Sequence, residues 1–490
     1  MLSFITYTMP SKLPTVVLLA SLISSVVSIP SKYDFSKINA RNIINRDVVI
    51  VGGGSGGIHA AIGLKDNKKT IMVIETKENI GGHTQTVRDH NGHTAEAGVI
   101  VFHYEPEVMR YFGRLNVPLM NLSANYFSAN SRPYDFKTGQ AIPAAAIQQP
   151  SQQATGLALQ KFLAFLAKYP ELDRGLFLKT PVADELAMPI GTLIQNLGLE
   201  AIANLMYGLT QNAGDFLSTP VVEVTRVFGL SLLKTVIGGN FLTSARRDNS
   251  ELYRNAQAEL LAANSLLLSS NVIHTTRKND GVELVVQTPQ GIKYICAKKL
   301  LMAVPPRTEA LKAFDLRQNE KDVFNRLLSV GYYSALVNNT GIPNNLTALN
   351  VATDKPYGIP SLPGAFLVGA GTIPGIANVY FGTPASRSTY PYSDDFVKSQ
   401  MISTVKRLQA ANPKTFKQSN PDFYFFTAHA PYSMQARTED IKAGIYQRMY
   451  ALQGQDSCFW TGAAWRAEDS SNIWRYNNEV VLPALLKSLK

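Results

Sequence analysis

The sequence predicts an α/β fold: a discontinuous Rossmann-like dinucleotide-binding domain with an inserted α+β domain. Residues 47–51 form a short β-branched run, a glycine-rich turn follows, residues 58–64 carry a helix pattern, and residues 70–75 form a second apolar run. Strand, turn, helix and strand in this order make one βαβ unit. Residues 105–264 then carry a mostly helical pattern without nucleotide-binding motifs, which indicates an inserted region.

The later part of the chain returns to strand patterns. Residues 271–286 predict a hairpin with a tight Asp-Gly turn, and residues 294–297 and 300–304 predict two further strands that end at a Pro-Pro pair. Residues 330–444 are mixed, with strand-like pieces such as 365–368 and 423–426. A last short strand and turn are expected at 459–462.

The turn after the first strand contains the motif G-x-G-x-x-G, with Gly52, Gly54 and Gly57 at its three glycine positions. The first glycine permits the tight turn, the second lets a pyrophosphate approach the main chain, and the third lets the helix pack on the strand. Ser55 and Gly56 complete the helix N-terminus, whose free N–H groups attract phosphates. Because the motif lies between a strand and a helix, it indicates a dinucleotide site rather than a chance turn.

Glu75 ends the second strand of this unit. A carboxylate there can accept hydrogen bonds from both hydroxyls of an adenosine ribose, and its charge would repel a 2′-phosphate. Glu75 therefore argues against NADP. The alternative is a solvent-facing glutamate at the end of a strand.

A second glycine pair follows Glu75, in the segment Gly81-Gly82-His83-Thr84. Adjacent glycines let the main chain come close to a ligand where a Cβ would collide. With the first motif, this segment resembles the flavin-containing amine oxidase superfamily, whose members read E-x-x-x-x-x-G-G-R-x-x-T after the dinucleotide motif. Here His83 stands at the place of the family's arginine.

The resemblance continues in three further segments: residues 96–98, where the family has an acid and a glycine near the flavin, residues 303–306, and residues 461–464 with the helix behind them. In overall look the chain is most similar to fungal secreted oxidoreductases of the β-cyclopiazonate dehydrogenase type. A bacterial polyenoic fatty acid isomerase is a more distant relative of similar build. The resemblance implies that the cofactor is FAD and that both ends of the chain form its site.

The motifs and the resemblance together assign the cofactor contacts and the domains. The implied FAD-binding residues are Gly52, Gly54, Ser55, Gly56, Gly57, Glu75, Gly81, Gly82, His83, Thr84, Gly98, Ile273, Gly462, Ala463 and Ser471. The implied FAD-binding domain comprises residues 47–104, 255–308 and 445–490, and the substrate-binding or lid domain comprises residues 105–254 and 309–444.

A terminal helix is expected at residues 470–489, broken near Pro483. Asp469, Ser470 or Ser471 can cap it. Its N-terminal N–H groups would then face the flavin pyrimidine ring, where negative charge collects on reduction and the helix dipole stabilises it. The alternative is a helix that only closes the core.

No motif identifies a catalytic residue. His429 is the candidate base on the substrate side, and the alternative is an ordinary core histidine. His83 could contact phosphate or attach covalently to the flavin, and we expect a simple hydrogen bond. His93 and His103 lie close in sequence to the flavin-facing segment. The aromatic residues expected to line the pocket are Trp460, Trp465, Tyr424, Phe425 and Tyr432.

The first 28 residues predict a signal peptide. Lys12 precedes a short apolar run, and Val26 and Ser28 lie three and one residues before a plausible cleavage point. The run is short for a membrane span of about 20 residues. We therefore expect a secreted protein without stable membrane insertion, with three N-x-S/T sites that fit glycosylation, at Asn121, Asn338 and Asn345.

The charge and the cysteine content of the chain argue against nucleic-acid and metal partners. The formal net charge is +11, from 47 Lys and Arg against 36 Asp and Glu, but the basic residues are scattered, so a nucleic-acid partner is not expected. The two cysteines allow one disulfide at most, and Cys296, in an apolar strand pattern, is expected to be a buried free thiol. Neither Cys296 nor Cys458 has metal-ligand spacing, so no metal site is predicted.

These observations predict a secreted FAD-dependent oxidoreductase that removes a hydride from a small amine or alkaloid-like substrate, with dioxygen reoxidising the flavin. Two alternatives keep the flavin. One is a redox-neutral isomerase of unsaturated fatty acids, and the other is a secreted FAD-binding protein without catalysis.

Overall fold

The computed structural model describes residues 35, 38–123, 130–147, 149–210, 214–387 and 392–490. Residues before Asn39 form a unit of their own, and the following account concerns Asn39–Lys490. The predicted signal peptide, residues 1–28, lies outside the described residues. Among the helices described, none is both long and apolar enough to cross a membrane.

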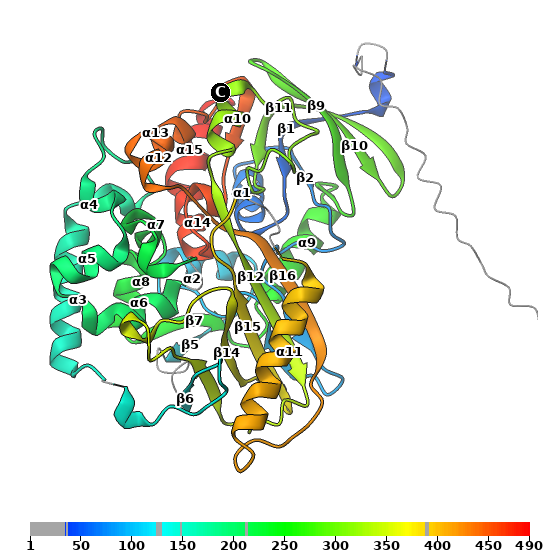
Figure 1. Ribbon diagram of the computed structural model, residues 1–490. Coiled ribbons are helices and arrows are strands. Elements are labelled where there is room, and N and C mark those ends of the chain that lie inside the picture. Colours follow the sequence, from blue (N-terminus) through cyan, green and yellow to red (C-terminus); the bar gives the residue numbers. More distant parts are fainter. Residues whose placement is uncertain (1–34, 36–37, 124–129, 148, 211–213, 388–391) are drawn as a thin grey trace, which may run out of the picture. The chain divides into compact units, whose positions relative to one another are not determined.

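The first sheet has the strand order β8-β2-β1-β11-β10-β9, with β17 also paired to β11 (Figure 1). β1 is parallel to both β2 and β11, whereas β10 is antiparallel to β11 and β9. The strands are β1 (Ile43–Val51), β2 (Ile71–Ile74), β8 (Leu266–Leu267), β9 (Asn271–Lys278), β10 (Gly281–Thr288), β11 (Gly291–Met302) and β17 (Cys458–Trp460). Three separate stretches of the chain thus form one sheet, as the discontinuous α/β prediction requires; the exact domain boundaries stay predictions.

The predicted βαβ unit is confirmed. β1 begins four residues earlier than expected, and its apolar residues 48–50 are fully buried, as are all four residues of β2. α1 (Ser55–Asp66) follows the glycine turn and buries most of its length, from Gly56 to Leu64. Small and aliphatic side chains on every face suit a helix that is covered on all sides.

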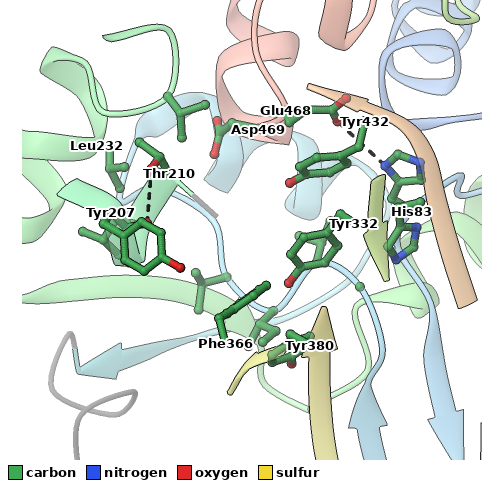
Figure 2. A pocket seen from close by; sticks show the side chains of 18 of the residues that line it. His83, Tyr207, Thr210, Leu232, Tyr332, Phe366, Tyr380, Tyr432, Glu468 and Asp469 are labelled. Atoms are coloured by element: carbon green, nitrogen blue, oxygen red, sulfur yellow. Dashed lines mark hydrogen bonds and ion pairs between the residues drawn. The ribbon is translucent and has the colours of Figure 1, made fainter. Parts of the chain in front are cut away.

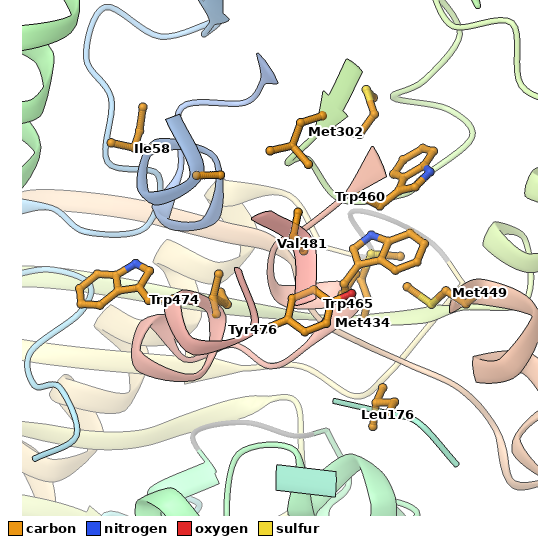
Figure 3. Packing of buried hydrophobic residues seen from close by; sticks show 14 of the residues in the cluster. Ile58, Leu176, Met302, Met434, Met449, Trp460, Trp465, Trp474, Tyr476 and Val481 are labelled. Atoms are coloured by element: carbon orange, nitrogen blue, oxygen red, sulfur yellow. The ribbon is translucent and has the colours of Figure 1, made fainter. Parts of the chain in front are cut away.

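The C-terminal helix lies against α1 (Figure 1). α14 (Ser470–Tyr476) continues through a π-helical turn, Asn477–Val481, into α15 (Leu482–Lys487) with helical φ and ψ at both junctions. The break predicted near Pro483 was wrong, because the helix changes its hydrogen-bond pattern before the proline without ending. Beneath these helices, Trp460 and Trp465 stack with ring centroids 5.6 Å apart in the main hydrophobic core (Figure 3).

A second sheet has the order β16-β12-β15-β14-β13-β6. Its strands are β6 (Ser131–Tyr134), β12 (Leu328–Asn338), β13 (Thr347–Asn350), β14 (Gly364–Ala370), β15 (Ile376–Gly382) and β16 (Asp422–Gln435). The predicted strand pieces 365–368 and 423–426 belong to β14 and β16. α11 (Asp394–Ala411) packs against β14 and β15.

The predicted helical region is confirmed, with short strands added to it. Its helices are α2 (Pro106–Arg114), α3 (Gln152–Ala167), α4 (Asp184–Ala187), α5 (Ile190–Leu197), α6 (Ala203–Thr210), α7 (Val221–Thr225), α8 (Leu230–Ile237) and α9 (Ser250–Ala262). Two-stranded sheets pair β3 (Thr86–Arg88) with β4 (Thr94–Glu96), and β5 (Leu119–Ser123) with β7 (Asn240–Ser244). The remaining helices are α10 (Gln318–Phe324), α12 (Thr438–Lys442) and α13 (Ile445–Tyr450).

Two further expectations were wrong. The strands predicted at 294–297 and 300–304 are one strand, β11, because Lys298 and Lys299 between them turn outward to Asp47 and Ser457 without interrupting the pairing. Cys296 is only half-buried, whereas Cys458 is fully buried, and both thiols are free.

Asn477 ties the C-terminal helix to the first glycine turn. Its side-chain amide donates to the Gly56 carbonyl at 2.8 Å and accepts from the Thr461 hydroxyl, and all three groups are buried. We predict that Asn477→Ala lowers the free energy of unfolding by about 1–3 kcal/mol, because the Thr461 hydroxyl loses its acceptor. Denaturant unfolding measures this. Asn478→Ala, at the exposed neighbouring position, serves as the control and should cost less; equal losses would contradict the role of Asn477.

Candidate active site

One cavity of about 1820 Å³ joins the predicted cofactor residues to the second sheet and the helical region. This exceeds the roughly 300–1,000 Å³ of a pocket for one drug-sized ligand, so it has room for a large cofactor together with a substrate. The predicted residues that line it are Gly52, Gly54, Ser55, Gly56, Glu75, Gly81, Gly82, His83, Thr84, Gly98, Gly462 and Ala463.

The glycines of the first motif do different work. A Cβ on Gly57 would lie 2.1 Å from the Gly52 carbonyl oxygen, so Gly57 is needed for helix packing, although it does not line the cavity. A Cβ on Gly54 would meet no atom nearer than 3.8 Å, and the φ of Gly54 is −78°, which any residue adopts. Gly54 is therefore not required by the protein's own packing; the space beside it fits an approaching pyrophosphate.

Glu75 is fixed by main-chain donors at the cavity wall. Its Oε2 accepts from the Gly53 N–H at 2.7 Å, and its Oε1 accepts from the Lys77 N–H at 2.8 Å. Oε1 also accepts from the Thr76 hydroxyl at 3.1 Å, so Oε2 is the oxygen that keeps a lone pair for a further donor, since each oxygen can accept about two hydrogen bonds. This geometry suits the hydroxyls of an adenosine ribose.

The two ends of the chain meet beside the motif. A Cβ on Gly56 would lie 3.1 Å from the Gly462 Cα, so this contact needs a residue without a side chain. Ser55 Oγ donates to Ser470 Oγ and accepts from the indole N–H of Trp474, both at 2.9 Å. The glycine turn and the start of α14 therefore form one continuous wall.

Asp469 caps α14, as one of the three candidates expected. Its Oδ1 accepts from the Asn472 N–H at 2.7 Å, and its Oδ2 lies 3.1 Å from His103 Nε2. Burial would raise the pKa of Asp469, but His103 and the capping hydrogen bond lower it below its ordinary value. Asp469 and His103 both line the cavity. Ser471 lies behind them and accepts from the His103 main-chain N–H.

Two histidines and a glutamate gather beside the second glycine pair and the cap of α14. The rings of His83 and His429 have centroids 4.4 Å apart, and Glu468 Oε2 lies 3.8 Å from His83 Nδ1 (Figure 2). Burial and then the charges of His429 and Lys77 hold the pKa of His83 well below its ordinary value. Burial also lowers the pKa of His429 to about 4 and raises that of Glu468 to about 7.

Tyrosines form much of the remaining wall. Tyr332, on β12, stacks on Tyr432 with centroids 5.0 Å apart, and Tyr380 and Phe366 continue the aromatic surface (Figure 2). Burial raises the pKa of Tyr332 and Tyr432 well above 10, so both hydroxyls stay protonated. Tyr207 faces this surface across the cavity, from α6.

Several sequence expectations need correction. Of the predicted pocket aromatics only Tyr432 lines the cavity. Trp460 and Trp465 belong to the main hydrophobic core, Phe425 packs against a small separate cluster, and Tyr424 is exposed. Glu96, expected near the flavin, is not among the residues that line the cavity: its carboxylate accepts hydrogen bonds from the Thr86 hydroxyl and the Asn249 N–H, and burial raises its pKa to about 8. Ile273 and His93 are not among the residues that line the cavity, whereas Gly98, His103 and His429 are.

Sequence reasoning missed Glu468, Tyr332, Tyr380 and Phe366. Glu468 lies four residues beyond the recognised 461–464 segment, and extending that segment to the helix cap would have included it. Tyr332, Tyr380 and Phe366 lie on strands β12, β15 and β14, and a strand pattern does not show which face of the sheet meets a cavity.

Known proteins of similar sequence identify the family of this chain. Residues 50–115 match the family of NAD(P)-binding Rossmann-like domains. The chain is 39% identical over 475 residues to the FAD-dependent oxidoreductase oblC of Cochliobolus heterostrophus, covering 96% of this chain and 97% of that protein. It is 30% identical over 446 residues to the β-cyclopiazonate dehydrogenase of Aspergillus oryzae, covering 91% and 94%.

The chain belongs to this family of FAD-dependent oxidoreductases. Its cofactor is FAD, and its substrate is a small molecule. Solved structures show the same fold at low identity. A CLA-producing fatty acid isomerase from P. acnes has a TM-score of 0.72 at 16% identity, covering 89% of this chain and 98% of that one. Putrescine oxidase bound to putrescine has a TM-score of 0.56 at 14% identity, covering 90% and 100%.

A substitution at Gly54 should abolish FAD binding without preventing folding. We predict that Gly54→Val folds but purifies without flavin, because the new side chain occupies the space beside the turn. Flavin absorbance and circular dichroism, measured together, test this. Gly57→Ala is the contrasting variant and should lower the melting temperature, since its Cβ meets the Gly52 carbonyl. Full flavin content in Gly54→Val would refute the assigned site.

Glu75 should contribute to the affinity for FAD. We predict that Glu75→Ala weakens FAD binding by about 10- to 150-fold, because charge-assisted hydrogen bonds of roughly 1.5–3 kcal/mol are lost. Titration of the apoprotein with FAD gives the dissociation constant. Glu78→Ala, at an exposed position three residues on, is the control; an unchanged constant in Glu75→Ala would place Glu75 outside the site.

Proposed function

We propose that this protein is a secreted FAD-dependent oxidase or dehydrogenase that removes a hydride from a small organic substrate with a basic nitrogen, such as an amine or alkaloid. The hydride leaves from a carbon next to nitrogen or a similarly activated carbon. Dioxygen is the proposed electron acceptor and is reduced to hydrogen peroxide. The proposal of secretion rests on the N-terminal sequence pattern.

The charge of the cavity wall carries this proposal. Among the described residues that line it are four carboxylates, Glu75, Glu200, Glu468 and Asp469, and neither a lysine nor an arginine. A buried charge without a partner is costly. A substrate carboxylate would find no counter-ion on this wall, whereas a basic nitrogen would find acids and neutral imidazoles.

FAD, when bound, supplies the hydride acceptor. The protein's own groups handle the proton. An alkylammonium must lose a proton before its α-hydrogen can leave as hydride, because the nitrogen lone pair stabilises the cation formed. Glu468 is placed for this step: Oε1 is held by the Ser433 N–H at 3.0 Å, while Oε2 faces His83. The aromatic wall limits water at the reacting carbon.

Anaerobic mixing tests the reaction class. A panel of secondary and tertiary cyclic amines is mixed with the yellow holoenzyme without oxygen, and bleaching of the flavin band is followed. Bleaching, then peroxide release when air is admitted, supports the proposal. A change in the absorbance of an unsaturated fatty acid without oxygen uptake would instead support a redox-neutral isomerase. Flavin that no tested compound of either class alters would contradict both.

The pH dependence should follow Glu468. Its pKa is raised to about 7, so the carboxylate is largely protonated below this pH and available as a base above it. We predict that the rate of flavin reduction by an amine rises through about pH 7. Glu468→Gln should lose this dependence and slow the rate by about 10²–10⁴-fold.

Glu200→Gln is the matched control, since Glu200 also lines the cavity but is exposed. It should keep the rise in rate near pH 7. A Glu468→Gln variant with an unaltered pH profile would exclude Glu468 as the proton acceptor.

A further inference from the structure

The guanidinium group of Arg226 holds residues 463–466 through hydrogen bonds to their main-chain carbonyls. Arg226 follows α7 in the helical region and is 5% exposed. Its Nε donates to the Arg466 carbonyl at 2.8 Å, and its Nη2 donates to the carbonyls of Ala463 and Ala464 at 2.8 and 2.9 Å. Its Nη1 donates to the Met434 carbonyl at 2.7 Å and to Glu223 at 2.8 Å. All five guanidinium N–H groups are thereby used.

This grip fixes the direction of a peptide group at the cavity. Ala463 and Ala464 begin a 3-10 helix, Ala463–Trp465, and both line the cavity. The first N–H groups of a helix have no partner within it, and in the described part of the chain neither of these two N–H groups meets an acceptor. In a trans peptide the C=O and N–H point in opposite directions. Since Arg226 holds the Ala463 carbonyl, the Ala464 N–H points away from the arginine.

We propose that Arg226 is a positioning residue for the flavin, acting through the peptide group between Ala463 and Ala464. The arginine aims the Ala464 N–H at the edge of the ring system where negative charge gathers on reduction. A cation bound to the carbonyl also polarises the N–H of the same peptide, which strengthens it as a donor. Arg226 thus raises the reduction potential of FAD without touching it.

Glu223 provides the opposing charge. Its Oε2 pairs with Arg226, while its Oε1 accepts from the Ala436 N–H at 3.0 Å and from the Tyr446 hydroxyl. Both members of the pair are at most 5% exposed. The positive charge that the peptide experiences is therefore reduced by Glu223, and removing the glutamate charge should have the opposite effect from weakening the arginine grip.

The test is a redox titration of the holoenzyme without substrate, so its result does not depend on the proposed reaction. In Arg226→Lys, three donors replace five. The ratio of affinities for reduced and oxidised FAD should fall by about tenfold, which makes the two-electron potential about 30 mV more negative. Glu223→Gln should shift the potential in the positive direction. Thermal unfolding of each variant records its stability.

Arg277→Lys is the matched control, because Arg277 forms an equally buried pair with Glu320, at 2.6 Å, and neither residue lines the cavity. It should lower stability and leave the potential unchanged. Potentials that shift in the same direction in Arg226→Lys and Glu223→Gln, or that stay unchanged, would overturn the proposal. A shift in Arg277→Lys as large as that in Arg226→Lys would overturn it too. Should Arg226→Lys fail to hold flavin, Glu223→Gln decides alone, because loosening of the fold does not predict a positive shift.

Discussion

The contact between Gly56 and Gly462 is the constraint on which the site depends. Two segments that are more than 400 residues apart in the sequence approach so closely that a Cβ on Gly56 would lie 3.1 Å from the Gly462 Cα, and Gly462 itself has a φ of +102°, which favours glycine. The contact places the N-terminus of α1 and the start of α14 along one wall, and Ser55 joins them by hydrogen bonds to Ser470 and Trp474. A cofactor that spans this wall is held by both ends of the chain at once.

Several segments of the chain between Gly56 and Gly462 line the cavity beside this contact. The chain leaves the first sheet, forms the helical region, returns for β8 to β11, forms the second sheet, and comes back as β17 beside β11. Each excursion returns a few residues to the wall, among them Tyr207, Tyr332 and His429. The excursions therefore supply much of the wall beyond the predicted cofactor residues, whereas the predicted cofactor residues come mostly from the first sheet and its turns.

This division explains what the sequence could predict. Cofactor residues such as Gly54 and Glu75 follow a fixed local pattern, because a phosphate or a ribose imposes the same geometry wherever it binds. The C-terminal segment was predictable only by resemblance, since its partner, Gly56, is distant in sequence. Arg226 and Tyr332 had no pattern to reveal them, because tertiary packing alone brings Tyr332 to the wall and Arg226 to the main chain behind it. The opposite error at Trp460 has the same cause: an aromatic run does not tell whether a ligand or the core lies beside it.

The absence of lysine and arginine from the described cavity lining follows from the way the cofactor is held. The phosphates of FAD would be held by main-chain N–H groups at the start of α1, which would need no cationic side chain there. Arg226, a buried arginine close to the 461–464 segment, lies behind the main chain and has its charge shared with Glu223. Its charge acts on the cavity through the directed N–H dipole and by lowering the pKa of Glu468 against the larger effect of burial. No lysine or arginine of the described cavity lining competes for Glu468, which is available to a basic nitrogen that enters the cavity.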